Sequence, residues 1–215
     1  MAEQDGTAAG APHGDELAGA FGGRVRRRRE EAGLTLEQLS ARSAVSRAML
    51  SKVERGEKSP TIGVASRIAH ALGATLSELT GAPATAPPGG STTTTPSGAS
   101  SGVAVVLRAE HRPVFRDPET GFERHVVSAA PGAGGAEMVL HRLPARVSTG
   151  LLPAYPAGAE KQLLVLAGTL TVRLGGADET LRAGDSLFLQ ADADHGFANR
   201  TDAPCEYVMF ISRRA

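Results

Sequence analysis

The sequence predicts a multidomain α plus β chain, in which a small all-α domain precedes an antiparallel β-barrel or β-sandwich. Three observations along its 215 residues predict this order. Residues 16–81 carry helix-capping signals, residues 82–102 contain only Ala, Pro, Thr, Gly and Ser, and residues 103–215 break into short strands between turns. Residues 1–15 show neither pattern, and we expect a disordered tail there.

Composition excludes several classes of protein. Lys plus Arg and Asp plus Glu both number 23, which excludes a uniformly basic nucleic-acid coat and an acidic tail. The single cysteine, Cys205, excludes a disulfide framework and a multi-cysteine zinc site, and we interpret it as a buried strand residue. Apolar runs are far shorter than the roughly 20 residues of a membrane span, and residues 1–14 do not resemble a signal peptide. We therefore expect a cytoplasmic protein that has no membrane partner.

Capping residues predict the helices of the first domain. Thr35 and Thr75 each begin a capping box, and Ser46 and Thr61 are further N-cap candidates. A glycine suited to the C′ position follows four helix-length segments: Gly33, Gly56, Gly73 and Gly81. We expect five helices, near residues 16–32, 35–43, 46–55, 61–72 and 75–80.

The segment 82–102 has the composition of a linker, and as a flexible coil its 21 residues would span about 25 Å. Such a connection predicts weak coupling between the two domains. Beyond it, residues 169–174 alternate strictly between polar and apolar, as in an antiparallel strand. We expect strands at residues 103–107, 125–127, 138–143, 162–174, 186–189 and 206–212.

Charge divides with the domains. Residues 20–82 hold 11 basic and 6 acidic groups, whereas residues 103–215 hold 12 basic and 13 acidic groups. Only the helical half therefore suits phosphate. On a helix over residues 46–55, one arc of about 140° carries five small or basic residues: Arg47, Ala48, Ser51, Lys52 and Arg55. Leu50 and Val53 point the other way, so the helix could enter a DNA major groove behind a short turn at 44–45. A merely solvated basic face stays open as the alternative.

The segments RRRREEAGLTLEQL (26–39) and VSRAMLSKVERGEKSP (45–60) resemble the XRE (Cro/C1-type) helix-turn-helix, which has a five-helix lambda-repressor-like fold. The resemblance covers about residues 25–80. It implies base-facing roles for Ser46, Arg47, Ala48, Ser51 and Lys52, and DNA-backbone contacts for Arg55, Lys58 and Ser59. Leu36 and Ala44 depart from the family, which often has a phosphate-binding Gln and a turn Gly there. For the run 26–29, phosphate contacts and a solvated helix face stay open.

The segments EKQLLVLAGTL (160–170) and GDSLFL (184–189), followed by His195 and Asn199, resemble the two motifs of a cupin β-barrel. A metal-binding cupin carries two His and a Glu in its first motif and a further His in its second. Here Lys161 stands in place of the Glu, and only His195 remains. The two His positions fall on Tyr155 and Ala157, or on Ala154 and Pro156 if the spacer is one residue longer. We therefore expect no metal and no cofactor. His125 and His141 could in principle rebuild a site, but we interpret them as ordinary strand histidines.

The barrel is left as a candidate pocket for a small molecule. Lys161 and Arg173 are expected to be available for an anion, and Tyr155 and His195 for hydrogen bonds. A barrel that serves only dimerisation is the alternative.

These features together predict a transcriptional regulator that binds double-stranded operator DNA as a homodimer and senses a small-molecule effector. The alternatives are a cupin enzyme, such as an oxygenase or isomerase, that carries a DNA-binding head, and an antitoxin-like partner protein.

Overall fold

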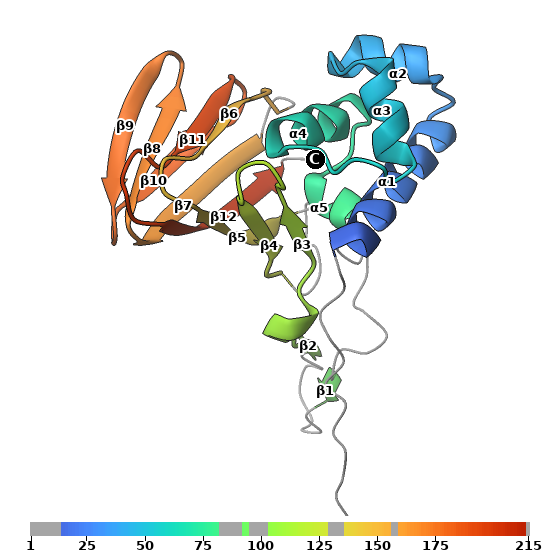
Figure 1. The fold of residues 1–215 in the computed structure, drawn as a ribbon. Helices are drawn as coiled ribbons and strands as arrows, with labels where there is room; N and C mark the ends of the chain where they lie inside the picture. Colours follow the sequence, from blue (N-terminus) through green and yellow to red (C-terminus); the bar gives the residue numbers. More distant parts are fainter. Residues whose placement is uncertain (1–13, 82–91, 95–102, 129–135, 156–158, 214–215) are drawn as a thin grey trace, which may run out of the picture.

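The computed structural model describes residues 14–81, 92–94, 103–128, 136–155 and 159–213. A bundle of helices packs against a two-layer β-domain (Figure 1). This arrangement confirms the predicted fold class. Nearly all of the expected tail (1–15) and most of the expected linker (82–102) lie outside the described residues. Within the described part, no helix is long and apolar enough to cross a membrane.

In the helical domain, which we call the head (residues 14–81), the second to fifth helices begin directly after the predicted N-cap residues. Its helices are α1 (Gly14–Glu31), α2 (Leu36–Ser43), α3 (Arg47–Glu54), α4 (Ile62–Ala71) and α5 (Leu76–Thr80). Both predicted capping boxes form, at Thr35 and Thr75, and the Ser46 and Thr61 side chains accept bonds from the first turns of α3 and α4. Fully buried aliphatic side chains from these helices form the core: Val25, Leu39, Leu50, Ile68 and Leu79.

The β-domain, which we call the barrel, is an antiparallel sandwich of two sheets. Its strands are β3 (Val114–Arg116), β4 (Glu123–Val126), β5 (Glu137–Leu143), β6 (Ser148–Leu152), β7 (Ala159–Ala167), β8 (Thr169–Leu174), β9 (Ala177–Arg182), β10 (Ser186–Gln190), β11 (His195–Ala198) and β12 (Cys205–Arg213). Six strands form one sheet in the order β10-β7-β12-β5-β4-β3, and four form the other in the order β6-β11-β8-β9. A 3₁₀ turn (Ala109–His111) precedes β3.

The structure departs from the predicted strands at several points. The run 162–174 is two strands separated by Gly168, which has φ +77° and where a Cβ would lie 2.4 Å from the Pro204 carbonyl oxygen. Five strands were not predicted: β1 (Thr92–Thr94), β3, β6, β9 and β11. β9 is polar and largely exposed, and β3 and β11 are short, so hydrophobic periodicity could not identify them. A short strand β1 (Thr92–Thr94), inside the expected linker, pairs with β2 (Val103–Val105).

The two domains are packed together, a contact that the composition of the linker did not predict; how strongly a ligand in one domain affects DNA binding by the other stays a prediction. In Figure 1, α4 and α5 lie next to the sheets, whereas α2 and α3 lie further out. The buried Asp117 carboxylate accepts a 2.8 Å bond from the Ile62 amide at the start of α4. The rings of Phe21 and Phe115 pack with centroids 6.0 Å apart. The composition of residues 82–102 predicts only that the connection is flexible. It carries no information about contacts between residues outside the linker, and these contacts hold the two domains together.

A buried polar cluster, which we call the interface cluster (Ser77, Arg124 and Glu137), also joins the domains. The Arg124 guanidinium donates to the Ser77 hydroxyl at 2.8 Å and to the Glu137 carboxylate at 3.1 Å. The Ser77 hydroxyl in turn donates to the other Glu137 oxygen. All three residues are buried, so the head is fixed against the barrel by directional bonds as well as by apolar contact.

Candidate DNA-binding surface and barrel interior

Local chain geometry positions α3 as a separate, outward-facing helix. The turn before it contains Ala44 in the left-handed region at φ 51°, a conformation that glycine adopts more easily. The Ser40 hydroxyl donates to the Val45 carbonyl at 2.7 Å and closes the turn. Ser46 then caps α3 by accepting from the Met49 amide at 3.2 Å. Ser46, expected among the base-facing residues, therefore already uses its hydroxyl within the helix cap.

The two faces of α3 differ as the periodicity predicts. Leu50 and Val53 are buried against the other helices. Among the expected base-facing residues, Ser51 is half-buried and four are exposed: Ser46, Arg47, Ala48 and Lys52. Position 22 requires glycine for this packing, because a Cβ there would lie 2.0 Å from the Val53 carbonyl oxygen. Sequence reasoning missed Gly22, since a glycine within a helix carries no sign of which neighbour it accommodates.

Several predicted DNA-contact cations pair with carboxylates in the unbound protein. Arg47 lies 3.4 Å from Glu37, and its side chain is 70% exposed. Arg55 bonds the Glu57 carboxylate with both of its guanidinium edge nitrogens, at 2.5 and 2.8 Å, and also donates to the Ser51 hydroxyl. Water screens exposed pairs of this kind and they contribute little to stability, so a DNA phosphate or base could replace either carboxylate at small cost.

The arginine run at 26–29 is largely used within the head. Arg29, with only 13% of its side chain exposed, bonds both oxygens of Glu54 at 2.7 and 2.9 Å, and this hydrogen bonding raises the pKa of Arg29. It therefore ties α1 to the end of α3. Arg28 pairs with Glu78 of α5 at 3.1 Å. Arg26 and Arg27 pair with glutamates one turn ahead on α1, at 2.9 and 3.8 Å.

Three of the four predicted pocket residues meet inside the barrel. The Lys161 Nζ lies 2.5 Å from the His195 Nε2 and 4.3 Å from the centre of the Tyr155 ring. The His195 Nδ1 lies 2.9 Å from the Ala193 carbonyl and can donate to it, which leaves Nε2 to accept from the lysine. Burial and the Lys161 charge lower the pKa of His195 to about 4, so the imidazole is neutral near pH 7.

Two further interior residues, His141 and Tyr207, have buried polar atoms without a partner. Neither ring nitrogen of His141 has a hydrogen bond in the structure, nor does the Tyr207 hydroxyl. The two rings are in contact, with centroids 4.8 Å apart. Burial is the main cause that lowers the pKa of His141, and the positive charges of Arg124, Lys161 and His125 add to it. Phe197 links this pair to His195, since its ring lies 5.6 Å from Tyr207 and 5.8 Å from His195. Because unpartnered buried polar atoms are rare in folded proteins, these mark a place where another molecule could bind.

The fourth predicted pocket residue, Arg173, lies elsewhere. It is exposed on β8 and bonds both oxygens of Asp178, at 2.7 and 3.0 Å. Arg200 bonds the same carboxylate, and these bonds lower the pKa of Asp178 to about 2. The structure therefore separates Arg173 from Lys161, because the alternation of β8 directs it outward while Leu170 and Val172 are buried.

The interior does not fit the metal that cupin barrels often hold. Among the described residues, no three His, Cys, Asp or Glu side chains come close enough together to bind an ion. An ammonium group 2.5 Å from His195 would repel a cation at the one ligand position that the motif retains. His125 pairs instead with Glu123 at 2.8 Å. Cys205 is buried, and burial raises the pKa of its thiol to about 11.

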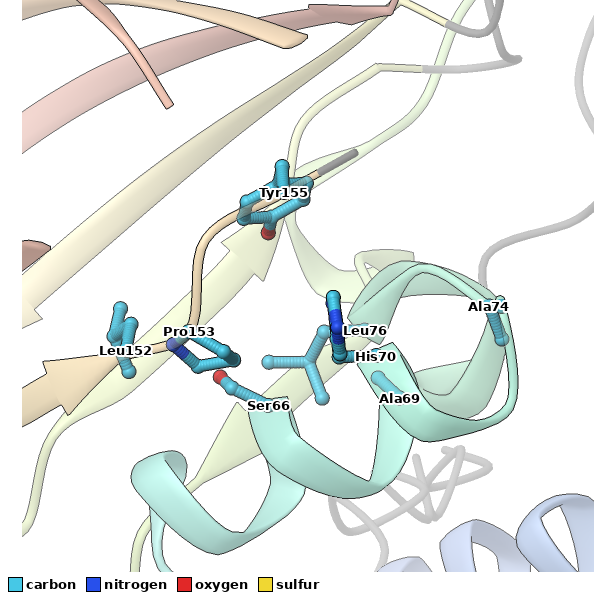
Figure 2. A pocket seen from close by; sticks show the side chains of 9 residues that line it. Ser66, Ala69, His70, Ala74, Leu76, Leu152, Pro153 and Tyr155 are labelled. Atoms are coloured by element: carbon cyan, nitrogen blue, oxygen red, sulfur yellow. The ribbon is translucent and has the colours of Figure 1, made fainter. Parts of the chain in front are cut away.

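A small pocket lies between the head and the barrel (Figure 2). Its volume is about 70 Å³, and Tyr155, Leu152 and Pro153 line it from the barrel side. Facing them are residues of α4, α5 and the turn between these helices: Ser66, Ala69, His70, Ala74 and Leu76. Tyr155 also contacts Lys161, so its side chain borders both the barrel interior and the pocket between the domains.

Comparisons with known proteins agree with both halves of the molecule. A helix-turn-helix family model matches residues 25–79, and a cupin domain model matches residues 157–211. The HTH-type transcriptional regulator SutR of Escherichia coli is 25% identical over 186 residues, which cover 86% of this chain and 90% of SutR. The HTH-type transcriptional regulator y4dJ of Sinorhizobium fredii is 43% identical over 58 residues, which cover 27% of this chain and 75% of y4dJ.

The fold of the whole chain also has a solved counterpart. The crystal structure of an HTH_3 family transcriptional regulator from Vibrio cholerae superposes with a TM-score of 0.70. The alignment covers 94% of this chain and 99% of that one, at 20% sequence identity. The likeness therefore extends over the head and the barrel together.

Proposed function

Because the chain belongs to the XRE-type helix-turn-helix transcriptional regulators that carry a cupin domain, we propose that it reads an operator through α3, pairs through its barrel and responds to a small anion. The observation that carries the proposal is the outward face of α3, where exposed Arg47, Ala48 and Lys52 lie opposite the buried Leu50 and Val53. Arginine and lysine bind guanine edges or phosphates, and alanine lets the backbone approach the groove. We assign Arg55, Lys58 and Ser59 to the DNA backbone.

Binding to DNA upstream of the protein's own gene, against scrambled competitor and across a salt series, tests the reading head. We expect sequence-specific binding with a steep salt dependence, and a loss of about 1–3 kcal/mol for Arg47→Ala with relaxed specificity. Arg182→Ala, an equal loss of charge on the exposed strand β9, is the matched control and should bind like wild type. An Arg47→Ala protein that also binds like wild type would remove α3 as the reading helix.

Self-association is proposed through the outer face of the six-stranded sheet. Four strands place Phe188, Gln162, Phe210 and Met138 in one cross-strand row. Three of these are exposed large apolar side chains, and Leu164 in the adjacent row is a fourth. Together with Val208 they line a hollow of about 370 Å³. A contiguous apolar patch on one sheet face suits an isologous contact with a second copy, in which the same patch serves both partners.

Sedimentation of the full chain tests this contact. We expect twice the 22.1 kDa chain mass for wild type and a monomer for the double variant Phe188→Lys/Phe210→Lys. Leu151→Lys places a charge on an equally exposed apolar residue of the other sheet and should leave the dimer intact. A dimeric double variant would show that the pairing surface is elsewhere.

The ligand is proposed to be a small anion, such as a carboxylate, held in the barrel interior. Lys161 and His195 lie there with Tyr155 above them, and His141 and Tyr207 supply unpartnered polar atoms nearby. These are mostly hydrogen-bond donors, and an ammonium group and neutral donors in a water-poor interior favour a negative guest. SutR and y4dJ are both named as transcriptional regulators, and we propose no catalytic reaction for the barrel.

Calorimetric titration with acetate and succinate as probes tests this site. We expect binding by wild type and its loss in Lys161→Met, with Arg173→Met as the matched control because it removes a like charge outside the barrel. Equal binding by both variants would place the anion elsewhere. Because Tyr155 lines both the interior and the domain interface, we propose that it carries the ligand's effect to the head.

A further inference from the structure

The β3–β4 turn of the barrel, residues 117–121, is built onto the head by one buried carboxylate. Asp117 is 1% exposed, and its Oδ2 accepts from the Ile62 amide at the start of α4 at 2.8 Å. Its Oδ1 accepts from the amides of Glu119 and Thr120, at 3.0 and 3.2 Å. The same side chain therefore shapes the turn and attaches it to the head, and the position of the turn relative to α4 is fixed.

This turn brings a second carboxylate to the edge of the head that we assign to the DNA backbone. The Glu119 Oε1 lies 3.6 Å from the Lys58 Nζ, and the two side chains are 57% and 48% exposed. Lys58 lies in the loop between α3 and α4, four residues before Ile62. A residue of the barrel thus lies beside a lysine that we assign to a phosphate of the DNA.

The strength of the two contacts differs in a way that matters for binding. An exposed lysine–glutamate pair contributes little to stability, because water screens the charges, and it would not hold a loop in place by itself. The buried Asp117 bonds hold the turn instead, so the backbone of Glu119 stays near Lys58 whether or not their ion pair forms. A phosphate that approaches Lys58 must therefore displace a carboxylate that cannot move far away, and it meets the charge of that carboxylate.

We propose that Glu119 is an affinity-determining residue for DNA binding, supplied by the barrel, which competes with a backbone phosphate for Lys58. Asp117 is the positioning residue that keeps it there. The proposal rests on the proposed contact between Lys58 and the DNA backbone. Its consequence is that the barrel lowers the affinity of the head for any duplex, independently of the base sequence.

Fluorescence anisotropy with the full chain and a labelled mixed-sequence duplex tests this, because a phosphate contact is independent of sequence. We expect Glu119→Gln to bind about two- to fivefold tighter than wild type at low salt, with the gain shrinking as salt rises. Lys58→Ala should weaken binding, and in that background Glu119→Gln should gain much less. Glu179→Gln removes the same charge from the exposed strand β9 and should bind like wild type.

The positioning role has its own readout. Asp117→Asn should tighten binding in the wild-type background but add nothing to Glu119→Gln, whereas a merely structural effect would appear equally in both backgrounds. Thermal unfolding of each variant shows that it is folded. If Lys58→Ala weakens binding and Glu119→Gln leaves it unchanged, the competition is refuted while the backbone contact stands. If Lys58→Ala binds as wild type does, the backbone contact and the competition both fail, and Arg47→Ala still tests the reading helix separately.

Discussion

Two clusters of polar side chains in the interior of this molecule differ in how completely their hydrogen bonds are formed. In the interface cluster, hydrogen bonds join Ser77, Arg124 and Glu137 to one another. In what we call the interior cluster (Tyr155, Lys161, His195, His141 and Tyr207), Lys161 contacts His195, but His141 and Tyr207 keep polar atoms without a partner.

The difference shows that a buried polar cluster can either fix the structure or remain able to bind a ligand, depending on whether its hydrogen bonds are complete. A buried polar group costs free energy unless it is hydrogen-bonded, so a completed cluster fixes one geometry and an incomplete one retains a capacity to bind. β5 contributes to both, since Glu137 belongs to the first cluster and His141, four residues or two strand periods further along the same face, belongs to the second. The strand therefore connects the domain interface directly with the proposed ligand site.

The largest effect is expected when one charged member of the interface cluster is removed and the other stays buried. Glu137→Leu leaves the Arg124 guanidinium buried without its charge partner and should lower the free energy of unfolding by about 3–5 kcal/mol. Adding Arg124→Met should restore most of the loss, because both charges are then gone. Urea unfolding of the single and double variants measures this. A double variant as unstable as Glu137→Leu would mean that volume and not charge determines the cluster.

The next effect concerns the pH dependence of the interior cluster. The pKa of His195 is about 4 in the folded protein against an ordinary 6.5, because burial and Lys161 oppose its protonation. Between these values the unfolded chain takes up a proton here and the folded chain does not. The contribution of His195 to the free energy of unfolding is therefore fully present above pH 6.5. It is lost, by up to about 3 kcal/mol, as the pH drops toward 4, and does not change further below that pH.

Urea unfolding of wild type and His195→Gln over this pH range checks the assignment. The variant should lose this part of the slope while the carboxylates titrate as before, with Lys161 and Asp194 the charged neighbours that shape the value. Parallel curves for the two proteins would show that His195 is not the titrating group.

The smallest effects are expected when one hydroxyl is removed from each cluster, and the two changes in the free energy of unfolding should differ in sign. Ser77→Ala removes a hydroxyl that both accepts and donates, so it should destabilise by about 1–3 kcal/mol. Tyr207→Phe removes a hydroxyl with no partner and should be neutral or stabilise by about 1 kcal/mol. Thermal unfolding of both variants in the same buffer decides between them. A destabilised Tyr207→Phe would indicate that the hydroxyl is already satisfied, and the ligand site would lose one of its donors.

Local signals predicted the helical head well and the barrel less completely. Capping residues act within a few positions of themselves, so Thr35, Ser46 and Thr75 predicted helix starts that the structure has. The apolar side of α3 followed from its 3.6-residue period in the same way. β9 was missed because a polar, exposed strand has no hydrophobic alternation, and its identity depends on pairing with β8.

The candidate sites divide along the same line. Helical spacing placed five candidate DNA-contact residues on one face: Arg47, Ala48, Ser51, Lys52 and Arg55. Ser46, Lys58 and Ser59 were chosen by resemblance alone. Tyr155, Lys161 and His195 were chosen by resemblance, and Arg173 shows the limit of such a choice, because strand alternation turned it outward to Asp178. His141 and Tyr207 could not be recognised, since an unpartnered atom is defined by its surroundings.

By itself, the sequence determined the order of the two domains, the helices of the head and the face of α3 that carries its exposed cations. These depend on interactions between residues close together in the chain. Tertiary structure alone decided that the head is fixed to the barrel, that Asp117 caps α4 and that Glu119 lies beside Lys58. Those contacts join residues at least 47 positions apart, where packing of two folded surfaces, and not local preference, determines which groups meet.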